Sequence, residues 1–387
     1  RELCAQVARE FRKLGRDKSG LSVLVVSGGE SGRQQAYALS RGVHVVVGTP
    51  GRLLDHLSRG TIRLDELTTL VLDEADRMLD MGFLPDIERL LEQTPASRQT
   101  MLFSATYPSS IKAISAKHQR EPAHVTIESE LTEAPQIRQL VVSVHAEHRL
   151  TALCWQLAEH QPDAALIFCN LKATVAELTL QLHALGASVA CLHGDLEQVE
   201  RDQVLAKFRN GSVRFLVATD VAARGIDIAD LDMVVNYEVP GQPGVYTHRI
   251  GRTGRAGKVG LAVSLLTPGD MRKLPSMDQQ SALPLERLSL EPEQLRLHAR
   301  HAGAIVEPAK MATIHIAGGR KDKLRPGDIL GALTGEAGGM NATDIGKIEI
   351  HDRIAFVAVS RGLARHAADS LSQGRMKGRA FRASLLR

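Results

Sequence analysis

Short apolar runs alternate with stretches of helical periodicity over the first third of the chain. The runs that are long enough to form strands are residues 23–26, 43–47, 70–72, 100–103 and 124–127. Between them, apolar residues recur at helical spacing, for example over 87–93 and 109–118. Because strands that alternate with helices pair side by side, the pattern predicts a parallel sheet with helices on both faces.

A second series of the same kind begins at Leu140 and continues to about Leu266. Its expected strands are residues 165–168, 189–192, 214–218, 233–236 and 261–265. The polar stretch 128–136, which contains Pro135, separates the two series and is interpreted as an interdomain linker. The sequence therefore predicts two successive α/β domains.

The pattern weakens after Pro268, and a helical stretch at 292–301 is interpreted as a connector. From Met311 onward a β-α-β-β-α-β order is expected, with strands at 313–316, 348–351, 354–359 and 382–386. Pro326 lies at the start of the first expected helix and Gly374 just past the second, which is where such residues mark helix ends. This order of elements is that of the RRM, a small fold that binds RNA.

The composition fits a globular protein of two or three domains, since 43% of the 387 residues are apolar. No run is long and apolar enough for a transmembrane helix or signal peptide, so a cytoplasmic protein that binds no membrane is expected. Residues 310–387 carry 14 Lys and Arg against 7 Asp and Glu, whereas the residues before them carry 34 against 37. This basic excess favours a nucleic-acid partner for the last domain; a solvated charged surface is the alternative.

Three carboxylates, Asp73, Glu74 and Asp76, follow the apolar run 70–72, which is expected to form a buried parallel strand. Ligands of open α/β sheets bind at the carboxyl ends of strands. An aspartate there can hold Mg2+, usually through water, and the adjacent glutamate can orient or deprotonate an attacking water. The alternative is that such carboxylates are solvated or cap a helix, and Asp76 is a candidate for that role.

Residues 248–255, His-Arg-Ile-Gly-Arg-Thr-Gly-Arg, place three arginines at spacings of three. Arg249, Arg252 and Arg255 are expected to project from the start of a helix toward a common polyanion, because guanidinium groups bind phosphate oxygens through two parallel hydrogen bonds. Taken alone, the triplet is equally compatible with a solvated surface or a nonspecific nucleic-acid patch. The distant carboxylates decide between these interpretations.

Together the two motifs resemble those of the DEAD-box family of ATP-dependent RNA helicases. The family's other signatures are found in order as Gly28-Gly29, Thr49-Pro50-Gly51-Arg52, Ser104-Ala105-Thr106, the pair Gln198 and Arg201, Ala218-Thr219-Asp220 and Ala223-Arg224-Gly225-Ile226-Asp227. The resemblance implies ATP and Mg2+ as cofactors and two RecA-like domains, residues 1–128 and 137–270, that face each other across a cleft. Residues 310–387 would form the RRM-like domain, so the expected fold is α/β with a small α+β domain at its end.

The resemblance also implies roles for single residues. Asp73 would belong to the metal shell, Glu74 would act on the attacking water, and Arg252 and Arg255 would stabilise charge on the transferring phosphoryl group. The residues that would contact the nucleotide are Gly225 and Asp227. The residues that would couple nucleotide state to RNA are Ser104, Thr106, Asp76 and His248. For the two hydroxyls, capping of a helix that begins near Ser109 is the alternative.

Matches to the family's RNA-contact motifs are Arg1, Gly28, Gly29, Thr49, Arg52, Gln198, Arg201, Thr219 and Asp220. These residues are expected to grip sugar and phosphate, which gives affinity with little sequence specificity.

The segments 319–323, 325–335 and 345–348 closely resemble the bacterial DbpA subgroup of this family. The resemblance implies a hairpin of large-subunit ribosomal RNA as the partner and a role in ribosome assembly. The basic residues expected to bind it are Arg320, Lys321, Lys323, Arg325, Lys347, Lys377, Arg379 and Arg382. Only Phe356, with His315 as a further candidate, stands at a base-stacking position, so recognition is expected to rest on charge and RNA shape.

One departure concerns ATP. The chain begins inside a family motif, at Arg1-Glu2-Leu3-Cys4-Ala5-Gln6, and contains no phosphate-binding loop of the form G-x-x-x-x-G-K-[ST]. The chain as given is therefore expected not to hydrolyse ATP efficiently. Two classes stay open: an ATP-dependent RNA helicase whose missing segment is present in the parent protein, and a nonenzymatic RNA-binding protein. The intact Asp73, Glu74, Arg252 and Arg255 favour the helicase, because simple binding needs none of them.

Overall fold

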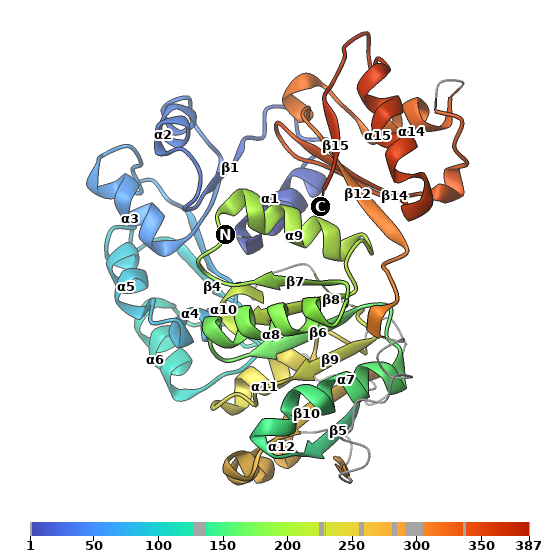
Figure 1. Cartoon of the computed structure of the whole chain (residues 1–387). Helices are drawn as coiled ribbons and strands as arrows, with labels where there is room; N and C mark the ends of the chain where they lie inside the picture. The colour runs from blue at the N-terminus through green and yellow to red at the C-terminus, as the bar shows by residue number, and fades with distance from the viewer. Residues whose placement is uncertain are drawn as a thin grey trace. The chain divides into compact units, whose positions relative to one another are not determined.

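The computed structural model describes residues 2–126, 137–223, 228, 230–254, 259–280, 285–290, 305–335 and 338–386 (Figure 1). The chain forms two compact units: Arg1–Glu130, and the greater part of the remainder, Leu131–Arg224 and Ile228–Arg387. The expected linker 128–136 and connector 292–301 lie outside the described residues. The same holds for four candidate site residues, Arg1, Gly225, Asp227 and Arg255.

Strands alternate with helices in the first unit, as the apolar pattern predicts. The strands form two parallel pairs, β1 (Val23–Val26) with β2 (Val45–Gly48) and β3 (Thr69–Leu72) with β4 (Gln99–Leu102). The helices are α1 (Glu2–Leu14), α2 (Gly32–Ser40), α3 (Pro50–Ser58), α4 (Ala75–Asp80), α5 (Leu84–Glu92) and α6 (Ser109–His118). The candidate residues of this unit lie in the turns that connect a strand to the following helix.

Two expectations for the first unit are wrong. Residues 124–126 are not in a strand; Val125 is 85% exposed, so this run has no core to pack against. Strand β3 is parallel, as expected, but it is not buried, since Val71 is 45% exposed. Exposure alternates along the strand, with Thr69 and Val71 exposed and Leu70 and Leu72 half-buried, so one face of β3 is not covered within the described residues.

A seven-stranded parallel sheet forms the centre of the second unit, in the order β11-β5-β10-β9-β6-β8-β7. The strands are β5 (Ile137–Ser143), β6 (Ala165–Cys169), β7 (Val189–Leu192), β8 (Phe215–Thr219), β9 (Met233–Asn236), β10 (Gly260–Leu266) and β11 (Glu286–Ser289). All five residues of the central strand β6 are buried, as expected of a parallel strand covered on both faces. The apolar pattern does not predict β11, because its sequence Glu-Arg-Leu-Ser contains a single apolar residue.

Helices cover both faces of this sheet. On one face, α7 (Arg149–His160) and α8 (Lys172–Ala184) contribute Leu153, Leu157 and Leu178 to the larger core. On the other face, α11 (Pro243–Ile250) and α12 (Leu274–Gln280) pack through Tyr246 and Leu274. Helices α9 (Gln198–Arg209) and α10 (Asp220–Ala223) follow β7 and β8. This arrangement confirms the α/β fold expected for the second domain.

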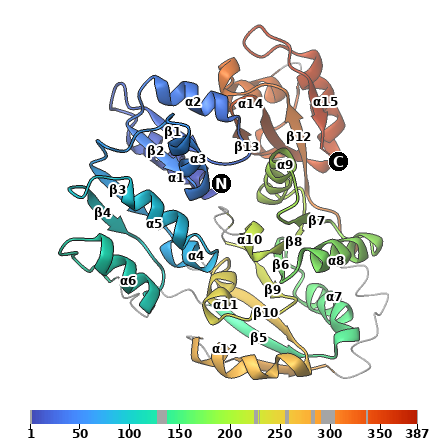
Figure 2. The same ribbon diagram turned by 90° about the vertical axis from the view of Figure 1, so that its left-hand side faces the viewer.

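The C-terminal domain belongs to the second unit and has the predicted β-α-β-β-α-β order (Figures 1 and 2). Its elements are β12 (Met311–Ile316), α14 (Pro326–Thr334), β13 (Ile345–Ile350), β14 (Ala355–Ser360), α15 (Ala364–Gln373) and β15 (Ala383–Leu385). The strands form an antiparallel sheet in the order β13-β14-β12-β15. A separate core, which includes Ile314, Ile329, Val357 and Leu371, joins one face of the sheet to the two helices. None of the helices in the described part of the chain is long and apolar enough to cross a membrane.

Candidate functional site

Glu74 occupies the turn between β3 and α4 in the first unit. Its backbone is left-handed, with φ 50° and ψ 47°, a conformation that costs a residue with a side chain on the order of 1 kcal/mol. The Glu74 N–H donates to Asp73 Oδ1 at 3.0 Å, and Arg77 Nη1 donates to Glu74 Oε2 at 3.0 Å. The turn therefore holds two carboxylates at the carboxyl end of a parallel strand, where ligands of open sheets bind.

Asp76 is buried and joins the start of α4 to the segment after β4. Its Oδ2 accepts hydrogen bonds from the N–H and the hydroxyl of Thr106, at 3.0 and 2.8 Å. The Ser104 hydroxyl accepts from the Asp76 N–H at 3.3 Å and donates to the carbonyl oxygen of Thr106 at 2.6 Å. Asp76 Oδ1 also accepts the N–H of the next residue, Arg77, at 3.0 Å. The alternative that Asp76 caps a helix does not match the structure, because the N-cap residue of α4 is Glu74 and the start of this helix has no side-chain capping hydrogen bond.

The alternative role for Ser104 and Thr106, capping of α6, does not match the structure. The N-cap residue of α6 is Pro108, and the start of this helix has no side-chain capping hydrogen bond. Both hydroxyls instead bond within the network around Asp76. The candidate coupling residues of the first unit, Asp76, Ser104 and Thr106, are therefore in contact with one another.

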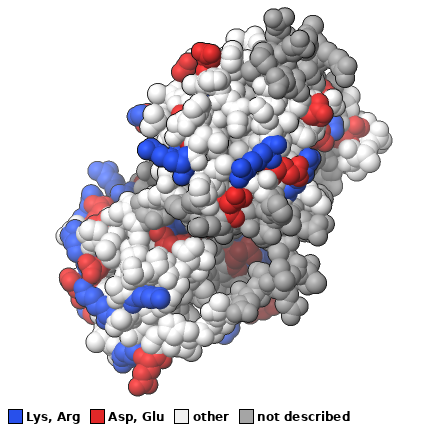
Figure 3. Space-filling view, turned by 90° about the horizontal axis from the view of Figure 1, so that it is seen from below, with Lys and Arg blue, Asp and Glu red and all other residues white. Residues whose placement is uncertain are grey.

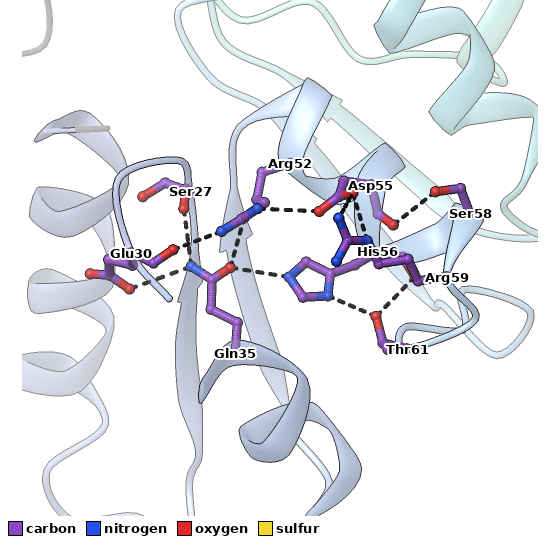
Figure 4. Close-up of polar contacts among 9 residues, drawn as sticks. All are labelled: Ser27, Glu30, Gln35, Arg52, Asp55, His56, Ser58, Arg59 and Thr61. Carbon is purple, nitrogen blue, oxygen red and sulfur yellow. Dashed lines mark hydrogen bonds and ion pairs between the residues drawn. The ribbon is translucent and has the colours of Figure 1, made fainter. Parts of the chain in front are cut away.

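The candidate RNA contacts of the first unit lie at the ends of β1 and β2. Val26 is paired with Gly48 in the parallel register, so the segments that follow the two strands lie at the same edge. Gly29 has a φ of 88°, which only glycine adopts readily. Arg52 is turned inward: it donates to the carbonyl oxygen of Glu30 at 2.7 Å and to Gln35 Oε1 at 3.0 Å (Figure 4).

Arg249 is buried in the second unit, with 1% of its side chain exposed. Its Nε and Nη2 donate to the two carboxylate oxygens of Asp220, both at 2.7 Å. Nη1 donates to Asn236 Oδ1 at 3.1 Å and to the carbonyl oxygen of Glu238 at 2.6 Å, and Nη2 also donates to Asn170 Oδ1 at 2.8 Å. All five N–H groups of the guanidinium are thereby used inside the protein.

The expectation that three arginines project toward one polyanion is therefore wrong for Arg249. The segment also lies at the end of α11, not at the start of a helix, because the helix stops at Ile250. His248, in the last turn, and Arg252, just past the helix, are both half-buried. The structural role of Arg249 is to hold Asp220, the residue that follows β8 and Thr219.

Gln198 and Arg201, at the start of α9, also face inward. Arg201 is 8% exposed and donates to the carbonyl oxygens of His193 and Ala222, each at 3.3 Å. This burial is at odds with the expected direct grip on RNA, and Arg201 instead ties α9 to α10. Gln198 Nε2 donates to Asp202 Oδ1 at 3.0 Å. Within the described part of the chain, the buried Oε1 of Gln198 has no hydrogen-bond partner.

One face of the C-terminal sheet packs against the end of α9, within the same unit (Figures 1 and 2). Arg209 binds the Glu349 carboxylate through two hydrogen bonds, at 2.7 and 3.1 Å. The Thr313 hydroxyl bonds to Asn210 Nδ2 and Ser212 Oγ, both at 2.8 Å. The face on which an RRM stacks bases is therefore occupied by the preceding domain.

Phe356 lies on this covered face and has no exposed surface. Its ring lies between those of His315 and His351, at centroid distances of 5.7 and 5.5 Å. The expectation that Phe356 stacks on a base is therefore wrong for this arrangement, because no base can reach it. His315 is half-buried, and burial lowers the pKa of its ring.

The basic residues of the C-terminal domain are placed differently, since every one of the candidates is exposed. These residues are Arg320, Lys321, Lys323, Arg325, Lys347, Lys377, Arg379 and Arg382. The loop that holds Arg320, Lys321 and Lys323 contacts the loop that holds Lys377 and Arg379, because Lys377 Nζ donates to the carbonyl oxygen of Lys323 at 2.8 Å. These two segments are the C-terminal loops. Exposed cations gathered on two touching loops can contact a phosphate backbone together.

The distribution of charge on the face shown in Figure 3 differs from that on the C-terminal loops. Acidic and basic side chains lie next to each other over that face, with no broad area of one sign. This mixture agrees with the nearly balanced charge of the residues before 310. Strong attraction of RNA through net charge is therefore expected from the C-terminal domain.

Several residues that shape the site could not be found from motifs. Arg77 holds Glu74, Asn170 and Asn236 saturate Arg249, and Gln35 accepts from Arg52. Each of these residues holds a motif residue in place. Most of the contacts join segments that are distant in sequence, so a local motif does not reveal them. The one usable signal is a polar residue among apolar neighbours, as at Asn236 after Met233–Val235.

Comparison with known protein families gives three matches along the chain. Residues 1–114 match the DEAD/DEAH box helicase family, and residues 148–257 match the helicase conserved C-terminal domain. Residues 313–385 match the DbpA RNA binding domain.

Similar proteins match over nearly all of the chain. The ATP-dependent RNA helicase DbpA of Escherichia coli strain K12 is 45% identical over 388 residues, which cover 100% of this chain and 82% of that protein. DbpA of Bacillus subtilis strain 168 is 35% identical, with 98% and 82% covered. Among solved structures, Saccharomyces cerevisiae Dbp5 bound to RNA and ADP BeF3 is similar with a TM-score of 0.67, at 28% identity and over 79% of each chain.

Proposed function

The chain belongs to the DbpA-type DEAD-box RNA helicases, and on this basis we propose that it locally unwinds or remodels ribosomal RNA during assembly of the large ribosomal subunit, in the cytoplasm. The C-terminal domain would select the RNA, and the helicase domains would perform the ATP-dependent step. The observation that carries the proposal is the exposed basic surface of the C-terminal domain, whose sheet face is covered.

The turn after β3 supports the chemical part of the proposal. Asp73 is exposed, and one of its carboxylate oxygens accepts the Glu74 N–H, so the group fits a metal ion bound through water. When bound, Mg2+ and ATP would supply the phosphoryl group and neutralise charge on it. Glu74 would then orient a water molecule and accept its proton. The left-handed backbone of Glu74 supports this role, because such conformations are concentrated at functional sites.

The other candidate residues would serve the same ATP-dependent step. Asp76, Ser104 and Thr106 would pass the state of the nucleotide from α4 to the segment after β4, because they are bonded to one another. The remaining roles of the cycle fall to residues beyond the first domain in sequence. They are Gly225 and Asp227 for the nucleotide, Arg252 and Arg255 for the phosphoryl charge, and His248 for coupling.

These 387 residues contain no G-x-x-x-x-G-K-[ST] loop. We therefore propose that they bind RNA by themselves but turn over ATP inefficiently, because a loop of this kind holds the phosphates of ATP in related NTPases. Turnover is therefore to be measured in a protein that joins such a loop to these residues.

Arg320, Lys321 and Lys323 changed together to alanine are expected to weaken stimulation of ATP hydrolysis by a large-subunit ribosomal RNA hairpin about tenfold or more, because the variant cannot pair three exposed cations with phosphates. ATP hydrolysis without RNA should change little. The measurement is the RNA concentration for half-maximal stimulation of the ATPase.

A matched control changes Lys13, Arg16 and Lys18 to alanine, since these are also exposed cations but belong to the first unit. Equal effects of the two triple variants would show that net charge, and not the C-terminal loops, determines stimulation by the hairpin.

A further inference from the structure

A buried glutamine connects the two candidate RNA-contact segments of the first unit (Figure 4). Gln35, on α2, is 2% exposed. Its Nε2 donates to the carbonyl oxygen of Ser27 at 3.0 Å, directly before the Gly28-Gly29 turn. Its Oε1 accepts from Arg52 Nε at 3.0 Å, on the helix that follows Thr49. One amide side chain therefore fixes the loop after β1 against the start of α3.

Arg52, on α3, also bonds to the loop after β1. Its Nη2 donates to the carbonyl oxygen of Glu30 at 2.7 Å, and its Nη1 donates to Asp55 Oδ2 at 3.2 Å. Three of the five guanidinium N–H groups thus have partners inside the unit. The side chain is only 21% exposed, so most of it serves as a strut between the loop and α3.

His56 is a third member of this group: it contacts Gln35 and is only 2% exposed. Its Nε2 lies 3.1 Å from Gln35 Oε1, and its Nδ1 lies 2.7 Å from the Thr61 hydroxyl. Gln35 Oε1 must be the acceptor in this group, because arginine can only donate and the Ser27 carbonyl can only accept. His56 therefore carries its proton on Nε2, and Nδ1 faces the hydroxyl.

The electrostatic environment agrees with this assignment. Burial lowers the pKa of His56, and the Arg52 guanidinium lowers it further. A lowered pKa fits a neutral ring that donates from Nε2 to Gln35 Oε1. Two donors converge on the Gln35 carbonyl oxygen, and the amide has no other orientation that satisfies Ser27 and Arg52 together.

We propose that Gln35 and His56 are positioning residues for RNA binding, and that Arg52 acts mainly as their strut. They would hold the N–H groups of the Gly28-Gly29 turn and the segment around Thr49 in the spacing that successive phosphates require. The proposal rests on the RNA-binding function proposed above. It adds that two uncharged, buried side chains set how many phosphates the first unit contacts.

The test compares Gln35→Leu with Gln34→Leu, which makes the same change at the adjacent, exposed position of α2. Both are introduced into the full chain with Arg320, Lys321 and Lys323 changed to alanine, so that RNA binding outside the C-terminal loops dominates. Binding of a single-stranded oligouridylate is measured at several salt concentrations, and thermal unfolding is measured in parallel.

Gln35→Leu is expected to bind oligouridylate about tenfold more weakly, and its salt slope should stay near that of the parent, because the N–H groups of the turn are uncharged and release no counterions. Gln34→Leu should match the parent in both. A purely structural role would lower the unfolding temperature but leave the affinity, measured well below that temperature, unchanged, and that result would overturn the proposal. Equal affinities for the two leucine variants would overturn it as well.

Two further comparisons decide the question if Gln35→Leu does not fold. His56→Gln keeps an N–H donor for Gln35, whereas His56→Leu removes it, so only the second should weaken binding of oligouridylate. Arg52→Lys keeps the charge but cannot reach three acceptors. It should therefore resemble Gln35→Leu, and near-parental binding by Arg52→Lys would show that Arg52 simply binds a phosphate. If the parent itself fails to bind oligouridylate, the proposed RNA function of the helicase domains fails first.

Discussion

Glu74→Gln is expected to lower the turnover number of RNA-stimulated ATP hydrolysis about a hundredfold or more, which is the contribution typical of a general base. Binding of ATP and RNA should stay within about twofold, because the amide keeps the shape of the side chain. It also keeps an oxygen that can accept from Arg77, which donates to Glu74 at 3.0 Å. The measurement is steady-state ATP hydrolysis together with equilibrium binding of each ligand.

Glu92→Gln is the matched control, since Glu92 is an exposed residue at the end of α5 in the same unit. It should leave turnover unchanged. Unchanged turnover in Glu74→Gln would remove the role given to this carboxylate, and a parallel loss of RNA binding would indicate damage to the turn instead of loss of a base.

Arg249→Ala is expected to reduce the free energy of unfolding of the second unit by about 3–5 kcal/mol, because removing one partner leaves the other charge buried without compensation. Asp220, Asn170, Asn236 and the carbonyl of Glu238 would all be without this donor. Arg249→Lys should recover little of this stability, since an ammonium group has three donors and cannot span five acceptors.

The change in the free energy of unfolding is measured by urea denaturation, monitored through tryptophan fluorescence. The single tryptophan of the chain, Trp155, lies on α7 and packs against the larger core of the second unit. Arg138→Ala is the control, because Arg138 binds Glu286 with the same two-bond geometry at the surface, where such pairs contribute about 0–1 kcal/mol. Similar midpoint shifts for both variants would show that the buried network around Arg249 is not a main source of stability.

The sequence predicts elements well where apolar residues repeat, and poorly where burial depends on distant partners. Strand β9 and the C-terminal order of elements follow from the pattern because their apolar residues face a core directly. Strand β11 is not predicted, because it is stabilised by pairing with β5 and has few apolar residues of its own.

The candidate site shows the same limit. A motif identifies Asp73, Glu74 and Arg249, but it does not reveal which side chain faces a ligand and which faces the interior. Arg249 and Arg252 have the same chemistry and stand three residues apart, yet Arg249 is 1% exposed and Arg252 is half-buried. Burial of Phe356 likewise follows from the packing of β12 against α9, which no local pattern encodes.

The selection of RNA by residues 310–387 can be measured with the two parts of the chain. Their cores are separate: the C-terminal core contains residues between 312 and 381, and the two cores of the preceding domain contain residues between 137 and 305. Each part is therefore expected to fold by itself. Residues 310–387 and residues 1–309 are each titrated with a large-subunit ribosomal RNA hairpin and with an unrelated duplex, at several salt concentrations.

Residues 310–387 should prefer the hairpin, with an affinity that falls steeply as salt rises, and residues 1–309 should bind both RNAs alike. A preference for the hairpin retained by residues 1–309, and absent from residues 310–387, would contradict the assignment of RNA selection to the C-terminal domain.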